Sequence, residues 1–227
     1  MEYPDLGERV AGVRAKISAA ASRGGHGQTV TLVAVTKTHG PEAVEAACSI
    51  GVLDVGENKI QEATQKMSEV SAPVRWHLIG HLQRNKVKAV DHFTLVHSVD
   101  SGRLADAIHR FGMERGRAVD VLVQVNGSRE ESKGGYSVDD LHSEADRLAL
   151  LPGIRVCGVM TMGRLDAPER ELRESFQAAR TARGLLMEAG HPAKELSMGM
   201  SQDYEIAVEE GATMVRLGTT LFGAREK

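Results

Sequence analysis

Short apolar runs rich in β-branched residues alternate along the chain with longer segments of helical character. Eight such runs occur in the sequence. This alternation is typical of a parallel sheet, because parallel strands need a crossover connection that is usually a helix. The predicted strands are 30–36, 52–55, 74–79, 93–96, 119–125, 154–160, 195–198 and 213–217, and the helical segments between them are 41–50, 58–69, 82–90, 101–115, 137–150, 168–189 and 202–210.

Two architectures satisfy this alternation, a doubly wound open sheet and a closed (β/α)8 barrel. The count of eight, and a length of 227 residues, slightly below the usual barrel size of about 250 residues, favour the TIM barrel. Before the first strand, an apolar face with helical spacing runs from Leu6 to Ile17, and Gly24-Gly25 ends it. We therefore expect a single α/β domain over residues 1–227, with residues 1–24 forming an additional N-terminal helix and turn packed on the barrel.

Composition excludes several classes of protein. A formal net charge of -3 argues against a nucleic-acid partner, and only 4% aromatic residues leave little material for stacking on bases. No stretch approaches the roughly 18 apolar residues of a membrane helix, and the N-terminus lacks the apolar core of a secretion signal. Cys48 and Cys157 are too few for a disulfide framework. We expect a cytoplasmic protein without a membrane partner, and a monomer, because no uninterrupted apolar stripe demands a partner subunit.

The predicted strand ends carry the residues with chemical potential, and in a barrel these ends converge on one face. Lys37 follows the first strand directly. Desolvation at the end of an apolar barrel lowers the pKa of an amine and favours its nucleophilic neutral form, so Lys37 is a candidate for a Schiff base with a carbonyl compound. The alternative is a solvated lysine that opens a loop.

The last two predicted strands end in small residues, in the segments 197–201 and 216–220. Their backbone N–H groups could approach an anion, Ser201 and Thr219 add hydroxyl donors, and Ser201 is predicted to cap a helix that begins near Gln202. Loops after strands seven and eight are the recurrent phosphate site of such barrels. Two ordinary glycine turns are the alternative, and for Arg216 the alternative to an inward position beside a ligand is a surface ion pair.

Five separate motifs resemble the pyridoxal phosphate homeostasis protein family, of the YggS type. They are VAVTK (33–37), GENKIQEA (56–63), WHLIGHLQRNK (76–86), GVMTM (158–162) and LSMGMS (196–201) continuing to RLGT (216–219), in order along nearly the whole chain.

The resemblance implies a barrel related to the N-terminal domain of alanine racemase, with pyridoxal 5'-phosphate held by a lysine as an internal aldimine. Matched by position, Lys37 is the aldimine lysine, and Asn58 lies close to the cofactor ring. Arg216 lies at the pyridine nitrogen, and Ser201, Gly218 and Thr219 bind the phosphate.

The expected function is to hold pyridoxal phosphate in intracellular vitamin B6 homeostasis, with recipient apo-enzymes as expected partners and without strong catalysis. An arginine at the pyridine nitrogen disfavours its protonation and weakens the ring as an electron sink. Racemisation also requires a base on the opposite face, which a second domain supplies in alanine racemase and for which this length leaves no room. A pyridoxal-phosphate-dependent amino-acid racemase that uses Lys37, and a cofactor-free Schiff-base aldolase, stay open as alternatives.

Four further features are weaker. Lys59 stands where many members of the family have an aromatic residue, and Gln202 stands where an acidic residue is more usual. His77 and His81 have no third ligand at a metal-like spacing, so we expect no metal and interpret His77 as a packed imidazole. The stretch 132–135 is expected to form a loop over the end of the barrel.

Overall fold

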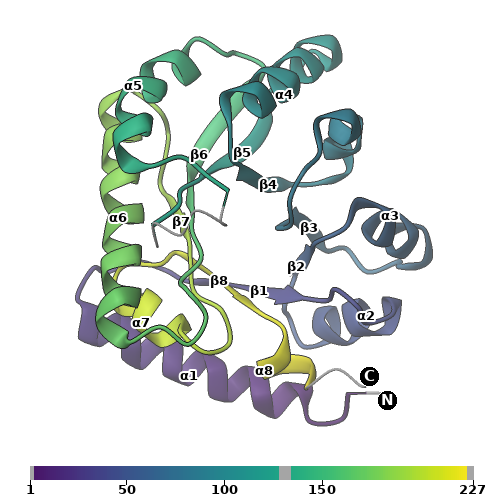
Figure 1. Ribbon diagram of the computed structural model, residues 1–227. Helices are drawn as coiled ribbons and strands as arrows, with labels where there is room; N and C mark the ends of the chain where they lie inside the picture. The colour runs from purple at the N-terminus through teal and green to yellow at the C-terminus, as the bar shows by residue number, and fades with distance from the viewer. Residues whose placement is uncertain (1–2, 128–133, 224–227) are drawn as a thin grey trace.

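A closed parallel barrel is the centre of the molecule. The computed structural model describes residues 3–127 and 134–223, and within them eight strands close in the order β1-β2-β3-β4-β5-β6-β7-β8, with β1 pairing in parallel with both β2 and β8 (Figure 1). The strands are β1 (Thr31–Val35), β2 (Asp54–Glu57), β3 (Arg75–Leu78), β4 (Leu95–Val99), β5 (Val119–Gln124), β6 (Ile154–Met160), β7 (Glu195–Ser197) and β8 (Met214–Leu217). The TIM barrel expected from the alternation is confirmed.

Helices connect successive strands and form the outer layer of the barrel (Figure 1). They are α1 (Leu6–Gly24), α2 (Pro41–Ser49), α3 (Ile60–Glu69), the 3-10 helix η1 (Arg84–His92), α4 (Gly102–Arg115), α5 (Val138–Ala149), α6 (Glu169–Glu188), α7 (Tyr204–Glu209) and α8 (Thr219–Phe222). Local signals explain several of their ends. Pro41 opens α2, and Gly25 and Gly116 end α1 and α4 in the left-handed conformation that glycine adopts without strain.

The structure differs from the expected elements in two places. The segment expected as a helix over 82–90 is a 3-10 helix, in which Val87 and Val90 are buried. These two valines are three residues apart, the period at which side chains eclipse in a 3-10 helix. A short helix, α8, also follows β8 and was not expected.

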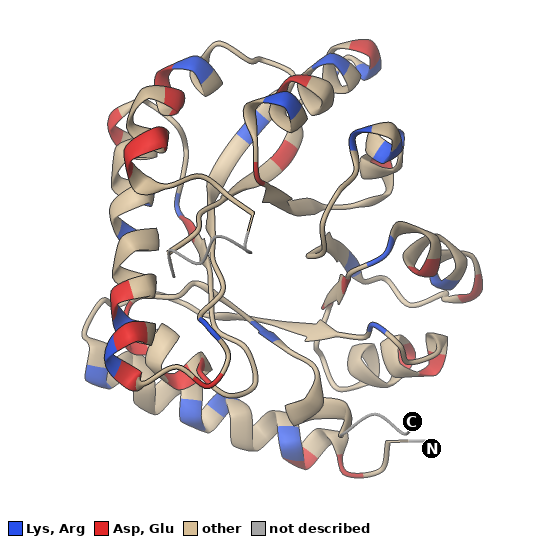
Figure 2. Ribbon diagram, viewed as in Figure 1, with Lys and Arg blue, Asp and Glu red and all other residues tan. Residues whose placement is uncertain are grey.

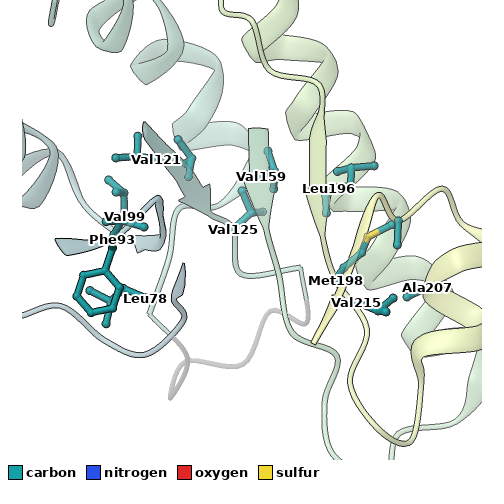
Figure 3. Close-up of a cluster of buried hydrophobic side chains, with 14 of the residues drawn as sticks. Leu78, Phe93, Val99, Val121, Val125, Val159, Leu196, Met198, Ala207 and Val215 are labelled. Atoms are coloured by element: carbon teal, nitrogen blue, oxygen red, sulfur yellow. The ribbon is translucent and has the colours of Figure 1, made fainter. Parts of the chain in front are cut away.

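Most of the apolar core lies between the barrel and its helices. Figure 3 shows part of this layer, in which Leu78 lies beside Phe93 and Val215 of β8 lies beside Ala207 of α7. A much smaller cluster is formed by Leu95, Leu122 and Met160. Because successive side chains of a strand point to opposite faces, these three residues alternate with members of the main cluster and face the barrel interior. Buried polar side chains, among them His77, His97 and Arg216, share that interior.

The N-terminal helix α1 packs against α7 and α8, next to the closure of β1 on β8 (Figure 1). It buries Leu6, Val10, Val13 and Ile17 along one face, as its spacing predicts. Charged residues lie mostly on the helices and seldom on the strands (Figure 2). Among the described residues, no helix combines the length and the apolar character that crossing a membrane requires.

Candidate functional site

The six candidate residues lie at the carboxyl ends of four strands that are neighbours in the barrel, β7, β8, β1 and β2. Lys37 follows β1 by two residues, and Asn58 follows β2 directly. Ser201 lies in the turn after β7, Arg216 lies within β8, and Gly218 and Thr219 follow β8. The register pairs Val33 of β1 with Arg216, and the Arg216 N–H donates to the Gly199 carbonyl at 3.0 Å. The closed sheet therefore brings together both ends of the sequence.

Lys37 is half-buried in a turn that α3 holds from the side. The Lys66 Nζ of α3 donates to the carbonyl oxygen of Thr36 at 2.7 Å, and the backbone N–H of Thr38 donates to Glu62 Oε1 at 2.5 Å. Both peptide neighbours of Lys37 are thus fixed by one helix. Thr38 has a φ of 68°, which is costly for a β-branched residue. We interpret these contacts as the compensation that holds the strained turn.

A buried carboxylate lies beside the same turn. Glu57, at the end of β2, is fully buried, and its Oε1 accepts hydrogen bonds from Thr36 Oγ1 at 2.6 Å and from Lys66 Nζ at 2.7 Å. Its Oε2 accepts no hydrogen bond from the described residues. Burial raises the pKa of Glu57, and the bonds from Lys66 and Thr36 offset only part of that rise. The Glu57–Lys66 pair joins the ends of β1 and β2 next to Lys37.

Ser201 connects the turn after β7 with the segment after β8. Its hydroxyl oxygen accepts a hydrogen bond from the backbone N–H of Thr220 at 3.3 Å. The expected role of Ser201 as a helix cap is wrong, because α7 begins at Tyr204 after the cap residue Asp203, whose Oδ1 accepts from the Met200 N–H at 2.6 Å. Asp203, and not Ser201, therefore accepts the hydrogen bond that closes the turn before α7. The Ser201 hydroxyl instead contacts the backbone that follows β8.

Arg216 is buried, with 5% of its surface exposed, so the surface ion pair considered from the sequence is wrong. Its Nη1 donates to Ser197 Oγ at 2.6 Å, and its Nη2 donates to the Thr161 carbonyl at 2.9 Å. Burial lowers the pKa of Arg216 to about 10, while Asp203 opposes the decrease. The guanidinium therefore remains a cation at neutral pH inside a low-dielectric interior.

Asn58 is half-buried and lies against Gly80, the residue that follows β3 by two positions. A Cβ atom at Gly80 would lie 2.7 Å from the Asn58 Cα and would overlap its carbonyl group. Glycine at position 80 thus permits the turn after β3 to approach the turn that carries Asn58.

The remaining sequence features fall elsewhere. His77 is buried, whereas His81 is exposed and bonds Asp100 Oδ2 at 3.1 Å. Lys59 and Gln202 are exposed. In the stretch 132–135, Ser132 and Lys133 lie outside the described residues, and the Gly134 carbonyl accepts from Gln124 Nε2 at 2.7 Å. The described part of the chain holds no group of three or more His, Cys, Asp or Glu residues that could bind a metal ion.

Sequence reasoning missed the residues that support the site. Glu57 stands within the quoted GENKIQEA motif but was not singled out, and Lys66 lies outside every motif. His97 was also missed, and Ser197, which was assigned with the segment 197–201 to an anion site, instead accepts from Arg216. The available signal was alternation, since a polar residue at an inward position of an apolar strand must find a partner inside the barrel.

This fold and site define a class of barrel proteins, described as "Alanine racemase, N-terminal domain"; the family matches residues 11–226. Two curated relatives are named pyridoxal phosphate homeostasis protein. The one from Pseudomonas aeruginosa is 40% identical and covers 97% of this chain and 96% of its own, and the one from Aquifex aeolicus is 38% identical and covers 96% and 98%. The chain belongs to the pyridoxal phosphate homeostasis protein family.

Solved structures agree with this assignment. PipY of Synechococcus elongatus PCC7942 without PLP superposes with a TM-score of 0.87 at 37% identity, and its structure with PLP bound superposes with a TM-score of 0.84 at 36% identity. Each covers 96% of this chain and 100% of the PipY chain. Alanine racemase from Corynebacterium glutamicum has a TM-score of 0.73 at 18% identity, and the likeness covers 61% of that chain. At that identity the likeness shows the fold alone.

Proposed function

We propose that residues 1–227 form a single pyridoxal-phosphate-binding domain, which holds the cofactor as a Schiff base on Lys37 and acts in intracellular vitamin B6 homeostasis without strong catalysis. The observation that carries the proposal is the convergence of Lys37, Ser201 and Arg216 at the ends of neighbouring strands. The names of the relatives and the PLP-bound structure of PipY support the choice of cofactor.

The phosphate end of the cofactor fits the segments after β7 and β8. An anion there would meet the hydroxyl groups of Ser201 and Thr219 and the backbone N–H groups that follow Gly218. The Thr220 N–H already donates to an oxygen at this place, that of Ser201. Gly218 lets the end of β8 lie close to the end of β1, since a Cβ atom at this position would lie 3.3 Å from the Val35 carbonyl oxygen.

The amine of Lys37 would hold the aldehyde end of the cofactor. Its nitrogen would bond the aldehyde carbon as a C=N group, with the carbonyl oxygen released as water. The contacts from Lys66 and Glu62 fix the backbone on both sides of Lys37, so the amine starts from a defined position. Asn58 would then lie beside the ring.

The position of Arg216 favours a protein that holds the cofactor over one that uses it for catalysis. Bound pyridoxal phosphate supplies an electron sink whose strength depends on a proton at the ring nitrogen. A buried guanidinium cation facing that nitrogen disfavours the proton, and a pKa of about 10 keeps Arg216 charged at neutral pH. Removal of an α-proton from an amino acid is therefore expected to be slow, whereas exchange of one amine for another does not need the full sink.

We further propose a monomer in the cytoplasm that passes the cofactor to apo-enzymes. The exposed large hydrophobic side chains of the described residues come from separate segments and support the monomer: Leu53, Met113, Leu150, Leu165 and Met187. Gel filtration with light scattering tests this state directly.

The first test is an absorption spectrum of the purified protein with pyridoxal phosphate, before and after borohydride. The expected result is a coloured adduct that borohydride fixes on Lys37, identified by peptide mass spectrometry, and that Lys37→Ala lacks. Lys59→Ala is the matched control, because Lys59 is exposed on the next strand end, and it should keep the adduct. A fixed adduct on Lys59 or Lys133, or a protein that stays colourless as a cofactor-free aldolase would, contradicts the proposal.

The second test separates holding the cofactor from racemisation. The cofactor-loaded protein is incubated with L-amino acids in deuterated water, and deuterium at the α-carbon is followed by NMR. We expect a rate of deuterium exchange close to the rate with free pyridoxal phosphate. Rapid exchange that depends on Lys37 would identify a racemase or another enzyme of this cofactor.

A further inference from the structure

Two histidines lie inside the barrel, where the proposed function does not use them. His77 of β3 is 3% exposed and His97 of β4 is fully buried. Leu78 and Val96, their neighbours along the strands, belong to the apolar layer under the helices, so both imidazoles face the interior. Buried ring nitrogens need hydrogen-bond partners, and both rings have them.

The two imidazoles form the middle of a continuous hydrogen-bonded chain. His77 Nε2 lies 2.9 Å from Asp54 Oδ1, and His77 Nδ1 lies 2.9 Å from His97 Nε2. His97 Nδ1 lies 2.9 Å from Ser197 Oγ, which also accepts from Arg216 Nη1 at 2.6 Å. Because β4 and β7 are not neighbours in the sheet, the contact between His97 and Ser197 crosses the interior of the barrel.

One arrangement of protons satisfies every bond in this chain with neutral imidazoles. Asp54 is ionised, since burial alone would raise its pKa but the bonds from His77 and Arg75 lower it to about 2. His77 Nε2 must therefore carry a proton, which leaves His77 Nδ1 as an acceptor. His97 Nε2 then donates a hydrogen bond to His77 Nδ1, and His97 Nδ1 accepts a hydrogen bond from the Ser197 hydroxyl.

This order of donors determines how Arg216 is held. The single proton of Ser197 is committed to His97, so the Ser197 oxygen is left to accept from Arg216. A second proton on His97 would sit on Nδ1 and place an N–H against the proton of the Ser197 hydroxyl. Burial is the largest cause of a His97 pKa well below its ordinary value, and the nearby Arg216 cation lowers that pKa further, in agreement with a neutral ring.

The far end of the chain is anchored at the opposite end of the strands. Asp54 is the first residue of β2, and Arg75, the first residue of β3, donates to Asp54 Oδ1 through Nε at 2.7 Å. The carboxylate therefore has a permanent cation on one side and the imidazole chain on the other. Hydrogen bonds connected in one direction polarise one another in a low-dielectric interior.

We propose that Asp54, His77, His97 and Ser197 are positioning residues, which fix the guanidinium of Arg216 in the orientation that meets the ring nitrogen of the cofactor. The proposal rests on the proposed function for the identity of that ring. Between the Asp54 carboxylate and Arg216 the chain contains only neutral groups, the two imidazoles and the Ser197 hydroxyl. This chain of hydrogen bonds thus orients the Arg216 cation without placing a carboxylate against it.

The first test needs no cofactor. Nitrogen-15 NMR of the imidazole groups, assigned with His77→Gln and His97→Gln, reports which ring nitrogen carries the proton. We expect an Nε2–H and a bare Nδ1 in both rings. A proton on Nδ1 of either ring, or protonation of His97 near neutral pH, would overturn the chain of donors.

The second test adds pyridoxal phosphate to Ser197→Ala, which cuts the chain next to Arg216 but leaves the Thr161 carbonyl in place. We expect the dissociation constant to rise on the order of tenfold, and the absorbance of the bound cofactor to titrate at a shifted pH. His97→Gln, which breaks the chain one bond further away, should change both in the same direction. Ser197→Thr keeps the hydroxyl and should restore both values.

The matched control is His191→Gln, because His191 bonds the Ala145 carbonyl on the outer layer at 2.8 Å, and it should leave both values unchanged. A folded Ser197→Ala protein that binds the cofactor within about twofold of the parent, with the same titration, would overturn the proposal while the proposed function stands. A parent protein that binds no cofactor would refute the proposed function, and the NMR test would still decide whether the chain of donors exists. If Ser197→Ala does not fold, His97→Gln and the NMR test decide.

Discussion

Lys66 reaches from α3 to the carbonyl oxygen of Thr36, the residue that precedes Lys37, at 2.7 Å. The same ammonium group donates to Glu57 Oε1 at 2.7 Å and to Glu62 Oε1 at 2.8 Å. One buried cation therefore joins the end of β1, the end of β2 and the helix that follows. Lys66 thus positions Lys37, the lysine proposed to bind the cofactor, and has no direct part in the proposed chemistry.

Replacing Lys66 with methionine should be strongly destabilising. The side chain is 6% exposed and its partner Glu57 is fully buried, so Lys66→Met leaves an uncompensated buried carboxylate. We expect the free energy of unfolding to fall by about 3–5 kcal/mol in urea denaturation. Lys16→Met is the matched control, because Lys16 pairs with Glu205 on the surface, and it should cost about 0–1 kcal/mol.

The double variant Lys66→Met with Glu57→Gln checks the cause. Removing both charges should recover part of the loss, because no ionised group then remains buried without a partner. A Lys66→Met loss no larger than that of Lys16→Met would contradict the role assigned to the pair.

Gly80 and Gly12 make a contrasting pair. Alanine at position 80 places a Cβ 2.7 Å from the Asn58 Cα, and backbone cannot yield without moving the turn that carries Asn58. We expect Gly80→Ala to cost about 1–3 kcal/mol and to weaken cofactor retention. Gly12 lies in the exposed interior of α1 with nothing within 4 Å of its Cβ position, so Gly12→Ala should stabilise by about 0.5–1 kcal/mol. If Gly80→Ala and Gly12→Ala change the thermal unfolding temperature equally, the predicted steric overlap at position 80 is refuted.

The sequence predicts the fold, and the meeting of the strand ends that carry the six candidate residues, for one physical reason. Strand ends in a parallel barrel converge, so residues placed just after β1, β2, β7 and β8 meet without any knowledge of side-chain directions. Lys37 and Thr219 are far apart in the chain, yet both need only the strand boundaries to be placed correctly. Alternation therefore predicts that these strand ends meet, whereas the proposed roles of the six residues come from the resemblance to the family.

The supporting contacts could not be predicted in this way. Lys66 acts from the side of a helix through a long flexible side chain, and helical periodicity does not say where its ammonium group ends. The partners His97 and Ser197 are 100 residues apart, on strands that do not pair. Their meeting depends on the stagger and width of the closed barrel, which the hydrophobic pattern does not encode.

Thr38 offers a test of the strain in the Lys37 turn. A β-branched residue at a φ of 68° pays a left-handed penalty of roughly 1–2 kcal/mol, whereas asparagine tolerates this region. Thr38→Asn keeps the backbone N–H that donates to Glu62 and should stabilise the fold by about 0.5–1 kcal/mol. Thr64→Asn, at an exposed position of α3, is the control and should change stability by less than about 0.5 kcal/mol. A Thr38→Asn protein no more stable than this control would show that the turn is not strained.

Stability should fall with acid in two stages set by the interior chain. The folded pKa of His97 lies well below 6.5, so below about pH 6.5 the unfolded state binds a proton that the folded state does not. The free energy of unfolding then falls by about 1.4 kcal/mol per pH unit for this group. The folded pKa of Asp54 is about 2 against 3.8 for the free side chain. Its contribution to the free energy of unfolding is therefore complete above about pH 4 and disappears as the pH falls towards 2.

Urea denaturation followed by circular dichroism, from about pH 8 to about pH 5, measures the first stage separately from the second. His97→Gln removes the titrating ring and should flatten the slope by about one proton in that range, although it lowers stability at every pH by breaking the chain. His191→Gln, on the outer layer, should keep the slope of the parent protein. If the slope of His97→Gln equals that of the parent, the buried neutral imidazole is not what makes the protein sensitive to mild acid. The assignment of neutral imidazoles behind Arg216 then loses its thermodynamic support.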